Sequence, residues 1–334
     1  MIDPTQRVPF GKTRLTVTRL GLGSAPLGNL FQPVSDEEAH ATIERAYQLG
    51  LRLFDTAPLY GLGLAERRIG AVLSRYPRHE FVLSTKVGRL IRPDPNADPS
   101  RVDSGTELFK GAPPLKAVFD FSYDGVMRSV EESLQRLGLD RIDILLIHDP
   151  DDYFDEAMQG AYPALDKLRR EGVISALGAG MNQVEIPIRF ARAADFDCFL
   201  IAGRYTLLDQ RALPELLPLC VEKNIAIIIG GVYNSGILAD PRPGAPFNYR
   251  PASQEWLDRA LRLKAVCDRH GVPLKAAAIQ FPLGHPAVAS VLTGARSVAE
   301  LEENERMMRL PIPAALWQEL KAEGLLPQEA PVPA

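Results

Sequence analysis

Short apolar runs alternate along the chain with longer segments in which apolar residues recur every three or four positions. The apolar runs have the length and near-continuous hydrophobicity of strands buried on both faces of a sheet. Eight runs fit this description: Arg19–Gly23, Arg52–Asp55, Phe81–Lys86, Ile142–His148, Ile174–Gly180, Cys198–Ala202, Ile225–Gly230 and Ala289–Thr293. Helical periodicity between them covers Ser122–Leu137, Tyr162–Glu171, Glu185–Ala194, Leu213–Lys223, Glu255–His270 and Val298–Met308. Because strand–helix alternation implies parallel strands, we predict an α/β fold, a (β/α)8 TIM barrel.

The chain also holds segments that a plain barrel does not need. An N-terminal β-hairpin is predicted over Arg7–Val17, with its turn at Gly11 and Lys12, and Asp36 is the expected N-cap of the first barrel helix. Residues 88–117 form a long Pro-, Asp- and Gly-rich loop after the third strand, and such loops are usually functional or disordered. Pro311–Ala334 predicts one extra C-terminal helix and a frayed tail. No interdomain linker interrupts residues 1–334, so we expect one domain.

Composition narrows the class of protein. The 334 residues are 46% hydrophobic and 24% charged, with a net charge of -4, which favours neither nucleic acid nor an anionic membrane surface as a partner. No apolar run approaches the roughly 18 residues that span a bilayer, and Met1–Thr16 lacks an apolar signal core. Cys198, Cys220 and Cys267 are expected as buried thiols. We therefore expect a cytoplasmic protein, and the oligomeric state stays open.

Four ionisable residues follow three consecutive predicted strands. Asp55 ends the second strand, Lys86 the third and His148 the fourth, and Tyr60 lies in the loop after Asp55. Each residue by itself also has a purely structural explanation. Asp55 could cap a turn and Lys86 could be solvated, while His148 could make a polar contact and Tyr60 could be a loop aromatic. Barrel enzymes carry their active sites at the C-terminal ends of the strands, so the coincidence favours a catalytic site.

This set of residues suits proton transfer. A tyrosine has a pKa near 10, and a lysine cation held by an aspartate would lower it. A neutral histidine would orient a substrate carbonyl, and the tyrosine proton would accompany hydride transfer at the adjacent carbon. The five histidines show no ligand spacing, so no metal site is expected.

The flanks of these residues resemble the aldo-keto reductase superfamily. The matching segments are FDTAPLYG (Phe54–Gly61), STKVG (Ser84–Gly88), LLIHDPD (Leu145–Asp151), AERRIG (Ala65–Gly70) and GARSVAELEEN (Gly294–Asn304). The resemblance covers nearly the whole chain. It implies an NAD(P)-dependent oxidoreductase in which Tyr60 is the general acid/base, supported by Asp55, Lys86 and His148.

The resemblance also implies where the cofactor binds. No GxGxxG motif follows the first strand, so a Rossmann site is not expected. The nicotinamide would lie beside the turn after the first strand, and the adenosine in the last loop. The implied cofactor-binding residues are Gly23, Ser24, Asp55, Asn182, Tyr233, Asn234, Ser235, Gly236, Leu238, Gly294, Arg296, Glu303 and Asn304. An exposed helix half is the alternative explanation for Glu303 and Asn304.

Several positions depart from the usual family pattern. Met181 stands where a serine is common, Ala202 where a glutamine is common, and Gly230 where a stacking tyrosine is common. Tyr233 either compensates for that tyrosine or is a plain wall residue. These departures, with AGRYTLL and HDPDD, resemble a bacterial sugar-dehydrogenase branch of L-fucose, D-threo-aldose and related pyridoxal dehydrogenases. The branch implies oxidation of a lactol carbon to a lactone, with residues 88–117 and 150–154 setting the specificity.

The last loop favours NAD over NADP. Relatives that use NADP often carry basic residues at the positions of Gly294 and Glu300, and Arg296 is the one remaining cation nearby. Arg296 would either reach a 2′-phosphate or stack on adenine. The expected partner is a small sugar or aldehyde. A general aldehyde or ketone reductase is the alternative enzyme. A non-catalytic NADPH-binding regulatory subunit is the alternative from another class, and the intact set of four residues argues against it.

Overall fold

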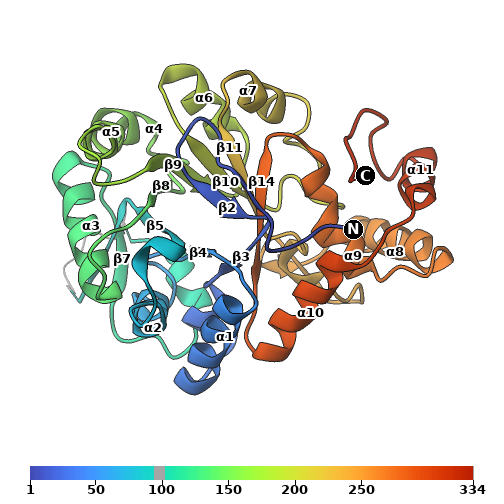
Figure 1. Cartoon of the computed structure of the whole chain (residues 1–334), viewed down its shortest axis with the longest axis horizontal. Coiled ribbons are helices and arrows are strands. Elements are labelled where there is room, and N and C mark those ends of the chain that lie inside the picture. Colours follow the sequence, from blue (N-terminus) through green and yellow to red (C-terminus); the bar gives the residue numbers. More distant parts are fainter. Residues whose placement is uncertain (94–101, 334) are drawn as a thin grey trace.

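The eight predicted strands form a closed parallel barrel at the centre of the molecule (Figure 1). They are β3 (Leu20–Gly23), β4 (Leu53–Asp55), β5 (Val82–Val87), β8 (Ile144–His148), β9 (Ala176–Met181), β10 (Cys198–Ala202), β11 (Ala226–Gly230) and β14 (Val288–Gly294). β14 pairs with β3 in the register Val291–Leu20 and closes the barrel. The computed structural model describes residues 1–93 and 102–333. The predicted fold class is confirmed.

Helices surround the strands (Figure 1). They are α1 (Asp36–Gln48), α2 (Leu64–Leu73), α3 (Tyr123–Leu137), α4 (Phe154–Glu156), α5 (Tyr162–Arg170), α6 (Glu185–Ala193), α7 (Leu216–Glu222), α8 (Gln254–Arg269), α9 (Leu274–Gln280), α10 (Val298–Arg309) and α11 (Ala314–Ala322). Short helical turns are η1 (Pro26–Gly28), η2 (Arg78–Glu80), η4 (Ser104–Leu108), η5 (Ala157–Ala161), η6 (Asn234–Gly236) and η7 (Phe281–Gly284). The predicted cap at Asp36 is wrong: the Ser35 hydroxyl accepts from the Glu38 amide at 3.2 Å, and Asp36 is the first helical residue.

The N-terminal hairpin closes one end of the barrel. β1 (Arg7–Pro9) pairs antiparallel with β2 (Thr16–Thr18), as the sequence predicts. Phe10 and Val17 are fully buried and pack with Leu53, Ile144 and the other apolar side chains of one core cluster. The hairpin therefore shields strand side chains that no outer helix covers.

The predicted long loop after the third strand contains a β-hairpin arm. β6 (Arg89–Arg92) pairs with β7 (Lys116–Phe119), and residues 94–101 of that loop lie outside the described residues. Gly88 has φ of 99°, and a Cβ there would lie 2.2 Å from the Phe121 ring. Only glycine fits where the chain turns out of the barrel. Leu30 forms a bridge with Phe109, so the arm lies against the loop after β3.

The C-terminal tail is packed, and the prediction of a frayed tail is wrong. Leu325, Leu326 and Ala330 are buried, although the sequence around them is Pro-rich. The Arg259 guanidinium donates to the Leu325 carbonyl at 2.7 Å, which ties the tail to α8. Tertiary contacts therefore order a segment whose local sequence favours no regular element.

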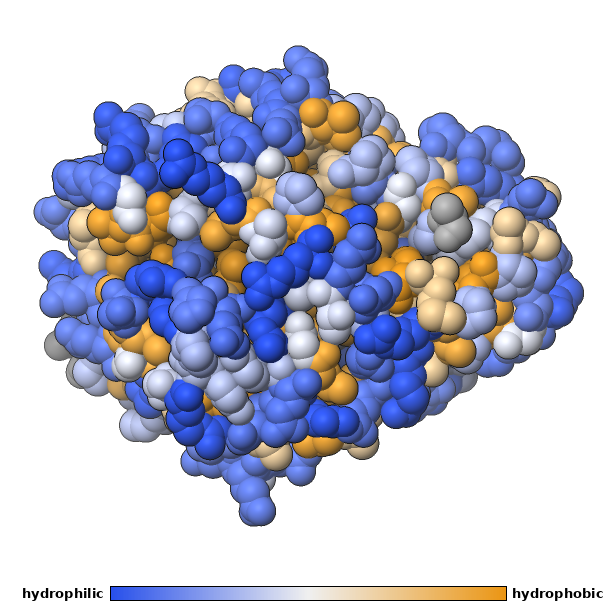
Figure 2. All heavy atoms as spheres, in the orientation of Figure 1, coloured by the Kyte–Doolittle hydropathy of each residue, from blue (hydrophilic) through white to orange (hydrophobic). Residues whose placement is uncertain are grey.

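The face of the molecule seen in Figure 2 is mainly hydrophilic. In Figure 2 polar side chains cover most of the visible face, and apolar side chains show in small areas between them. No helix of the described part of the chain is long and apolar enough to cross a membrane. Cys198, Cys220 and Cys267 are buried free thiols, as predicted.

Candidate active site

Three of the four predicted catalytic residues lie at the C-terminal ends of neighbouring strands. β4, β5 and β8 are adjacent in the barrel and bring Asp55, Lys86 and His148 to one rim. Lys86 Nζ donates to Asp55 Oδ2 at 2.7 Å and to the Thr56 carbonyl at 2.8 Å. Lys86 and Asp55 are 1% and 3% exposed, so their charges are paired out of contact with water.

Tyr60 lies on the turn after β4 and faces the other three residues. Its ring centroid is 4.8 Å from Lys86 Nζ and 6.0 Å from that of His148, with the two rings nearly perpendicular. Phe109 of the arm packs on Tyr60 with ring centroids 6.0 Å apart. The structure therefore brings all four predicted residues together.

The electrostatics of the group match the prediction for the histidine but not for the tyrosine. Burial, Arg89 and Lys86 hold the pKa of His148 well below its usual range, so the imidazole is neutral. Burial, followed by the Asp55 carboxylate, raises the pKa of Tyr60 well above 10. The expected lowering by Lys86 is therefore wrong for this structure, since Asp55 neutralises the ammonium charge at contact distance. Tyr60 is protonated at neutral pH.

Arg89 forms a network behind the histidine that the sequence did not reveal. It is 4% exposed and donates to the His148 carbonyl at 3.1 Å, to Asp103 at 2.5 Å and to Asp149 at 3.1 Å. The only sequence signal is its place at the start of the loop after β5. The network ties the arm to the end of β8.

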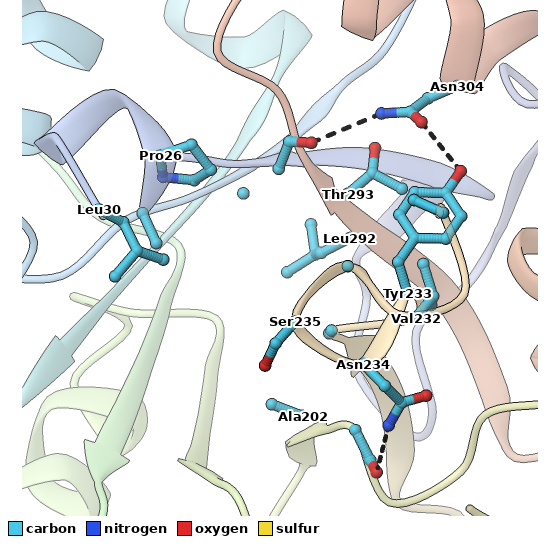
Figure 3. A pocket seen from close by; sticks show the side chains of 18 of the residues that line it. Pro26, Leu30, Ala202, Val232, Tyr233, Asn234, Ser235, Leu292, Thr293 and Asn304 are labelled. Carbon is cyan, nitrogen blue, oxygen red and sulfur yellow. Dashed lines mark hydrogen bonds between the residues drawn. The ribbon is translucent and has the colours of Figure 1, made fainter. Parts of the chain in front are cut away.

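A cavity of about 390 Å³ lies at the mouth of the barrel, and Tyr60 is one of its lining residues. Figure 3 shows part of the cavity wall. Most predicted cofactor residues line the cavity: Gly23, Asp55, Asn182, Tyr233, Asn234, Ser235, Gly236, Gly294, Arg296, Glu303 and Asn304. Ser24 and Leu238 are fully buried and are not among the lining residues. A role for those two residues stays a prediction. Sequence reasoning missed Phe31, Tyr249 and Lys275, which also line the cavity.

Two asparagines of the wall are engaged by the protein itself (Figure 3). Asn234 Nδ2 donates to the Gly203 carbonyl at 3.2 Å, and Asn234 Oδ1 accepts from the Thr206 hydroxyl at 2.7 Å. Asn304 Oδ1 accepts from the Tyr233 hydroxyl at 2.9 Å, so Tyr233 joins the loop after β11 to α10. Compensation by Tyr233 for the stacking tyrosine of relatives stays a prediction. Asn304 is 5% exposed, which excludes an exposed helix half at this position.

The cations at the far end of the cavity are paired. Arg296 donates to Glu300 through Nη2 at 2.8 Å, and its backbone amide donates to the same carboxylate at 2.9 Å. Lys275 Nζ donates to Glu303 at 2.8 Å. Lys275 was missed because it lies on α9, a short helix without a recognisable polar face in the sequence. Glu300 therefore holds the Arg296 guanidinium at the wall of the cavity.

The cavity fits a long ligand with two different ends. A Cβ on Gly294 would lie 2.5 Å from the Pro26 ring, so only glycine lets Pro26 pack this closely against the end of β14. The Thr293 hydroxyl lines the cavity, is buried and has no hydrogen-bond partner among the described residues. Such a group points to a ligand atom that completes its hydrogen bonding. One end of the cavity holds Tyr60 and Asn182, and the other holds the charged residues of α10.

Comparisons with known proteins agree with this geometry. The model of the Aldo/keto reductase family matches residues 19–323. The chain is 46% identical to D-threo-aldose 1-dehydrogenase of a Pseudomonas species, covering 94% of this chain and 96% of that protein. It is 43% identical to pyridoxal 4-dehydrogenase of Microbacterium luteolum, covering 97% and 99%. An aldo-keto reductase from Bacillus halodurans superposes with a TM-score of 0.75 over 98% of both chains at 24% identity, which supports the fold alone.

Proposed function

Because the chain belongs to the aldo/keto reductase family, we propose that it is an NAD(P)-dependent dehydrogenase that oxidises the C1 hydroxyl of an aldose to the lactone. The observation that carries the proposal is the meeting of Tyr60, His148 and the Lys86–Asp55 pair at one end of the long cavity. The 46% identity to a D-threo-aldose 1-dehydrogenase favours a sugar, and the L-fucose type is included in that class. The alternatives are oxidation of pyridoxal, which the name of the second relative favours, and reduction of general aldehydes or ketones.

The residues of the chain have distinct roles in this proposal. Tyr60 exchanges a proton with the oxygen on the reacting carbon, and neutral His148 holds that oxygen through a ring nitrogen. Lys86, fixed by Asp55 at 2.7 Å, keeps a positive charge within 4.8 Å of the Tyr60 ring. Asn182, which follows β9, and Asn304 of α10 would hold a nicotinamide dinucleotide, which would supply the hydride acceptor when bound. Thr293 and the backbone of Ser235 and Gly236 offer polar atoms along its path.

A substrate screen tests this function. Reduction of NAD and NADP is followed with a panel of aldoses and with pyridoxal, and oxidation of NADH and NADPH is followed with aldehydes and ketones. We expect the highest kcat/KM for an aldose as the hydride donor. A carbonyl reductase without aldose oxidation would overturn the proposal, and absence of all turnover with tight NADPH binding would favour the regulatory subunit.

The raised pKa of Tyr60 predicts opposite pH dependences for the two directions. Oxidation requires Tyr60 to accept a proton, so only its deprotonated fraction is active. With a pKa well above 10, that fraction rises about tenfold per pH unit through neutral pH. We expect kcat/KM for oxidation to rise between about pH 7 and about pH 9, while reduction stays nearly flat. A flat oxidation profile over this range would identify another base.

We propose that NAD is preferred over NADP, because Glu300 holds Arg296, the cation of the last loop that would face a 2′-phosphate. Glu300→Gln releases Arg296 and should lower the Kd of NADP about fivefold, while the Kd of NAD should stay nearly unchanged. Fivefold corresponds to the interaction free energy of about 1 kcal/mol that is usual for a partly exposed ion pair. Isothermal titration of both cofactors measures this. Glu302→Gln is the matched control on α10, where Glu302 pairs with Arg45 away from the cavity. Tighter binding of NADP than NAD by the wild type, abolished by Arg296→Ala, would show that Arg296 is the phosphate ligand.

We propose that the arm after β5 controls access to the sugar. Phe109 is buried against Tyr60, and Asn29 Nδ2 donates to the Lys110 carbonyl at 3.1 Å. Phe109→Ala should loosen this contact and raise the KM of the sugar by about tenfold, since barrel loops at this end carry substrate contacts. The Kd of the cofactor should stay unchanged, because Phe109 does not line the long cavity. Equal changes in both constants would show a general loss of packing instead.

Two further sequence predictions remain part of this proposal. The three buried free thiols suit the reducing cytoplasm, and we place the enzyme there. We also treat residues 1–334 as one domain acting on a small molecule. Size-exclusion chromatography with light scattering determines the oligomeric state.

A further inference from the structure

Asp149 directly follows His148 and contacts Asn182 in the wall of the long cavity. Its Oδ2 is 3.5 Å from His148 Nε2 and accepts from Arg89 Nη2 at 3.1 Å. Its Oδ1 accepts a long hydrogen bond of 3.5 Å from Nδ2 of Asn182, which lines the long cavity. Asp149 also lines a second cavity of about 330 Å³ on the side of the arm, together with Arg89, Asp103 and Tyr153. A substrate held by His148 therefore meets this carboxylate.

The backbone holds Asp149 in this place. Its φ is 41°, in the left-handed region that asparagine, aspartate and glycine tolerate best. Its amide donates to the Gly180 carbonyl at 3.0 Å, which fixes the turn after β8 to β9. Arg89 is anchored by Asp103 and by the His148 carbonyl, so the guanidinium position does not depend on Asp149 alone. The carboxylate is therefore positioned before substrate binds.

The inference rests on the proposed function. If His148 holds the oxygen on the reacting carbon, the Asp149 carboxylate lies where it can contact a neighbouring group of the substrate. We propose that Asp149 is a specificity residue that accepts a hydrogen bond from the hydroxyl on the carbon next to the reacting carbon. His148 Nε2 and Asp149 Oδ2 are 3.5 Å apart, so two oxygens on neighbouring carbons of one substrate can contact both groups at once. A carboxylate has about four acceptor positions, and Arg89 and Asn182 use two of them. The ring oxygen on the other side of C1 has no proton to donate, so it does not suit an acceptor.

The experiment compares substrates that differ only in this hydroxyl. Oxidation is measured with an aldose and its 2-deoxy counterpart, and reduction with glyceraldehyde and propanal. We expect the wild type to favour the hydroxylated member of each pair by about 10- to 100-fold in kcat/KM, as for a hydrogen bond to a charged group. Asp149→Asn and Asp149→Gly both tolerate the left-handed backbone and should reduce this ratio to about threefold or less.

A control variant and three possible results decide whether Asp149 recognises the hydroxyl. Asp155→Asn removes a carboxylate from exposed α4 and should keep the wild-type ratio. If Asp149 only positions His148, its variants will lower kcat/KM for both members of a pair by the same factor, and the inference is overturned. A wild type that shows no preference in either pair overturns it as well. A wild type that oxidises no aldose, but prefers glyceraldehyde through Asp149, contradicts the proposed function and leaves this inference standing.

Discussion

Tyr60→Phe should lower kcat for aldose oxidation by about 10²- to 10⁴-fold, the usual contribution of general acid–base catalysis. The substitution removes one hydroxyl from a ring that packs on Phe109 and faces Lys86 and His148. The ring contacts remain, so the fold and the Kd of the cofactor should stay close to those of the wild type. Steady-state kinetics, with cofactor binding measured by fluorescence titration, separates the two effects.

A matched variant shows whether the loss is specific to Tyr60. Tyr249 lines the same cavity and its hydroxyl is 3.5 Å from Asn182 Oδ1, so Tyr249→Phe removes an equivalent group at the other wall. We expect a change in kcat of less than about tenfold, because a long neutral hydrogen bond contributes little. Near wild-type turnover by Tyr60→Phe, or an equal loss in both variants, would remove Tyr60 from its proposed role.

Lys86→Met should abolish most activity and also destabilise the protein by about 3–5 kcal/mol at neutral pH, because it leaves a buried carboxylate without its partner. Lys86 and Asp55 are 1% and 3% exposed, Lys86 donates to Asp55 Oδ2, and Asp55 Oδ1 has no hydrogen-bond partner among the described residues. Chemical denaturation of the wild type and the variant gives the free energy of unfolding. Methionine fills a similar volume, so the loss should come mainly from charge.

The pH dependence of this destabilisation tests its cause. Burial raises the pKa of Asp55 above its ordinary value and Lys86 opposes this shift, so removing Lys86 raises the pKa further. A carboxyl whose pKa is higher in the folded than in the unfolded state destabilises the protein when ionised. The difference between variant and wild type should therefore shrink as the pH falls through the raised pKa.

A double variant separates charge from packing. Asp55→Asn with Lys86→Met removes both charges and should recover part of the lost stability, but no activity. If the double variant is as unstable as Lys86→Met alone, or if the destabilisation is independent of pH, then lost packing of the lysine stem is the cause.

The barrel itself was predictable because its physics is local. Strands buried on both faces must be continuous apolar runs, and all eight such runs became barrel strands. The shared location of Asp55, Lys86 and His148 was predictable too, since parallel strands of a barrel present their C-terminal ends at one rim. The family motifs around Tyr60 indicated the same group of residues.

Elements whose structure depends on distant contacts were missed or misjudged. The tail around Leu325 is ordered by Arg259, and the loop that begins at Gly88 becomes a hairpin because its two sides pair with each other. The sequence did not predict helix α2 (Leu64–Leu73), because buried polar residues interrupt its periodic pattern of apolar positions. Glu66 is fully buried there because the Thr85 hydroxyl and Arg136 satisfy it, at 2.8 Å and 2.5 Å.

The sequence by itself determined the eight-stranded barrel, the identity of the four residues at its rim and the lining of most of the long cavity. Only the tertiary structure decided their electrostatics. It pairs Lys86 with Asp55 and Arg296 with Glu300, so neither cation acts on its neighbours with its full charge. It also buries Tyr60 and raises its pKa, where residue types alone suggested the opposite shift. The reason is physical: a pKa depends on burial and on the distance to each charge, and both are set by segments far apart in the chain.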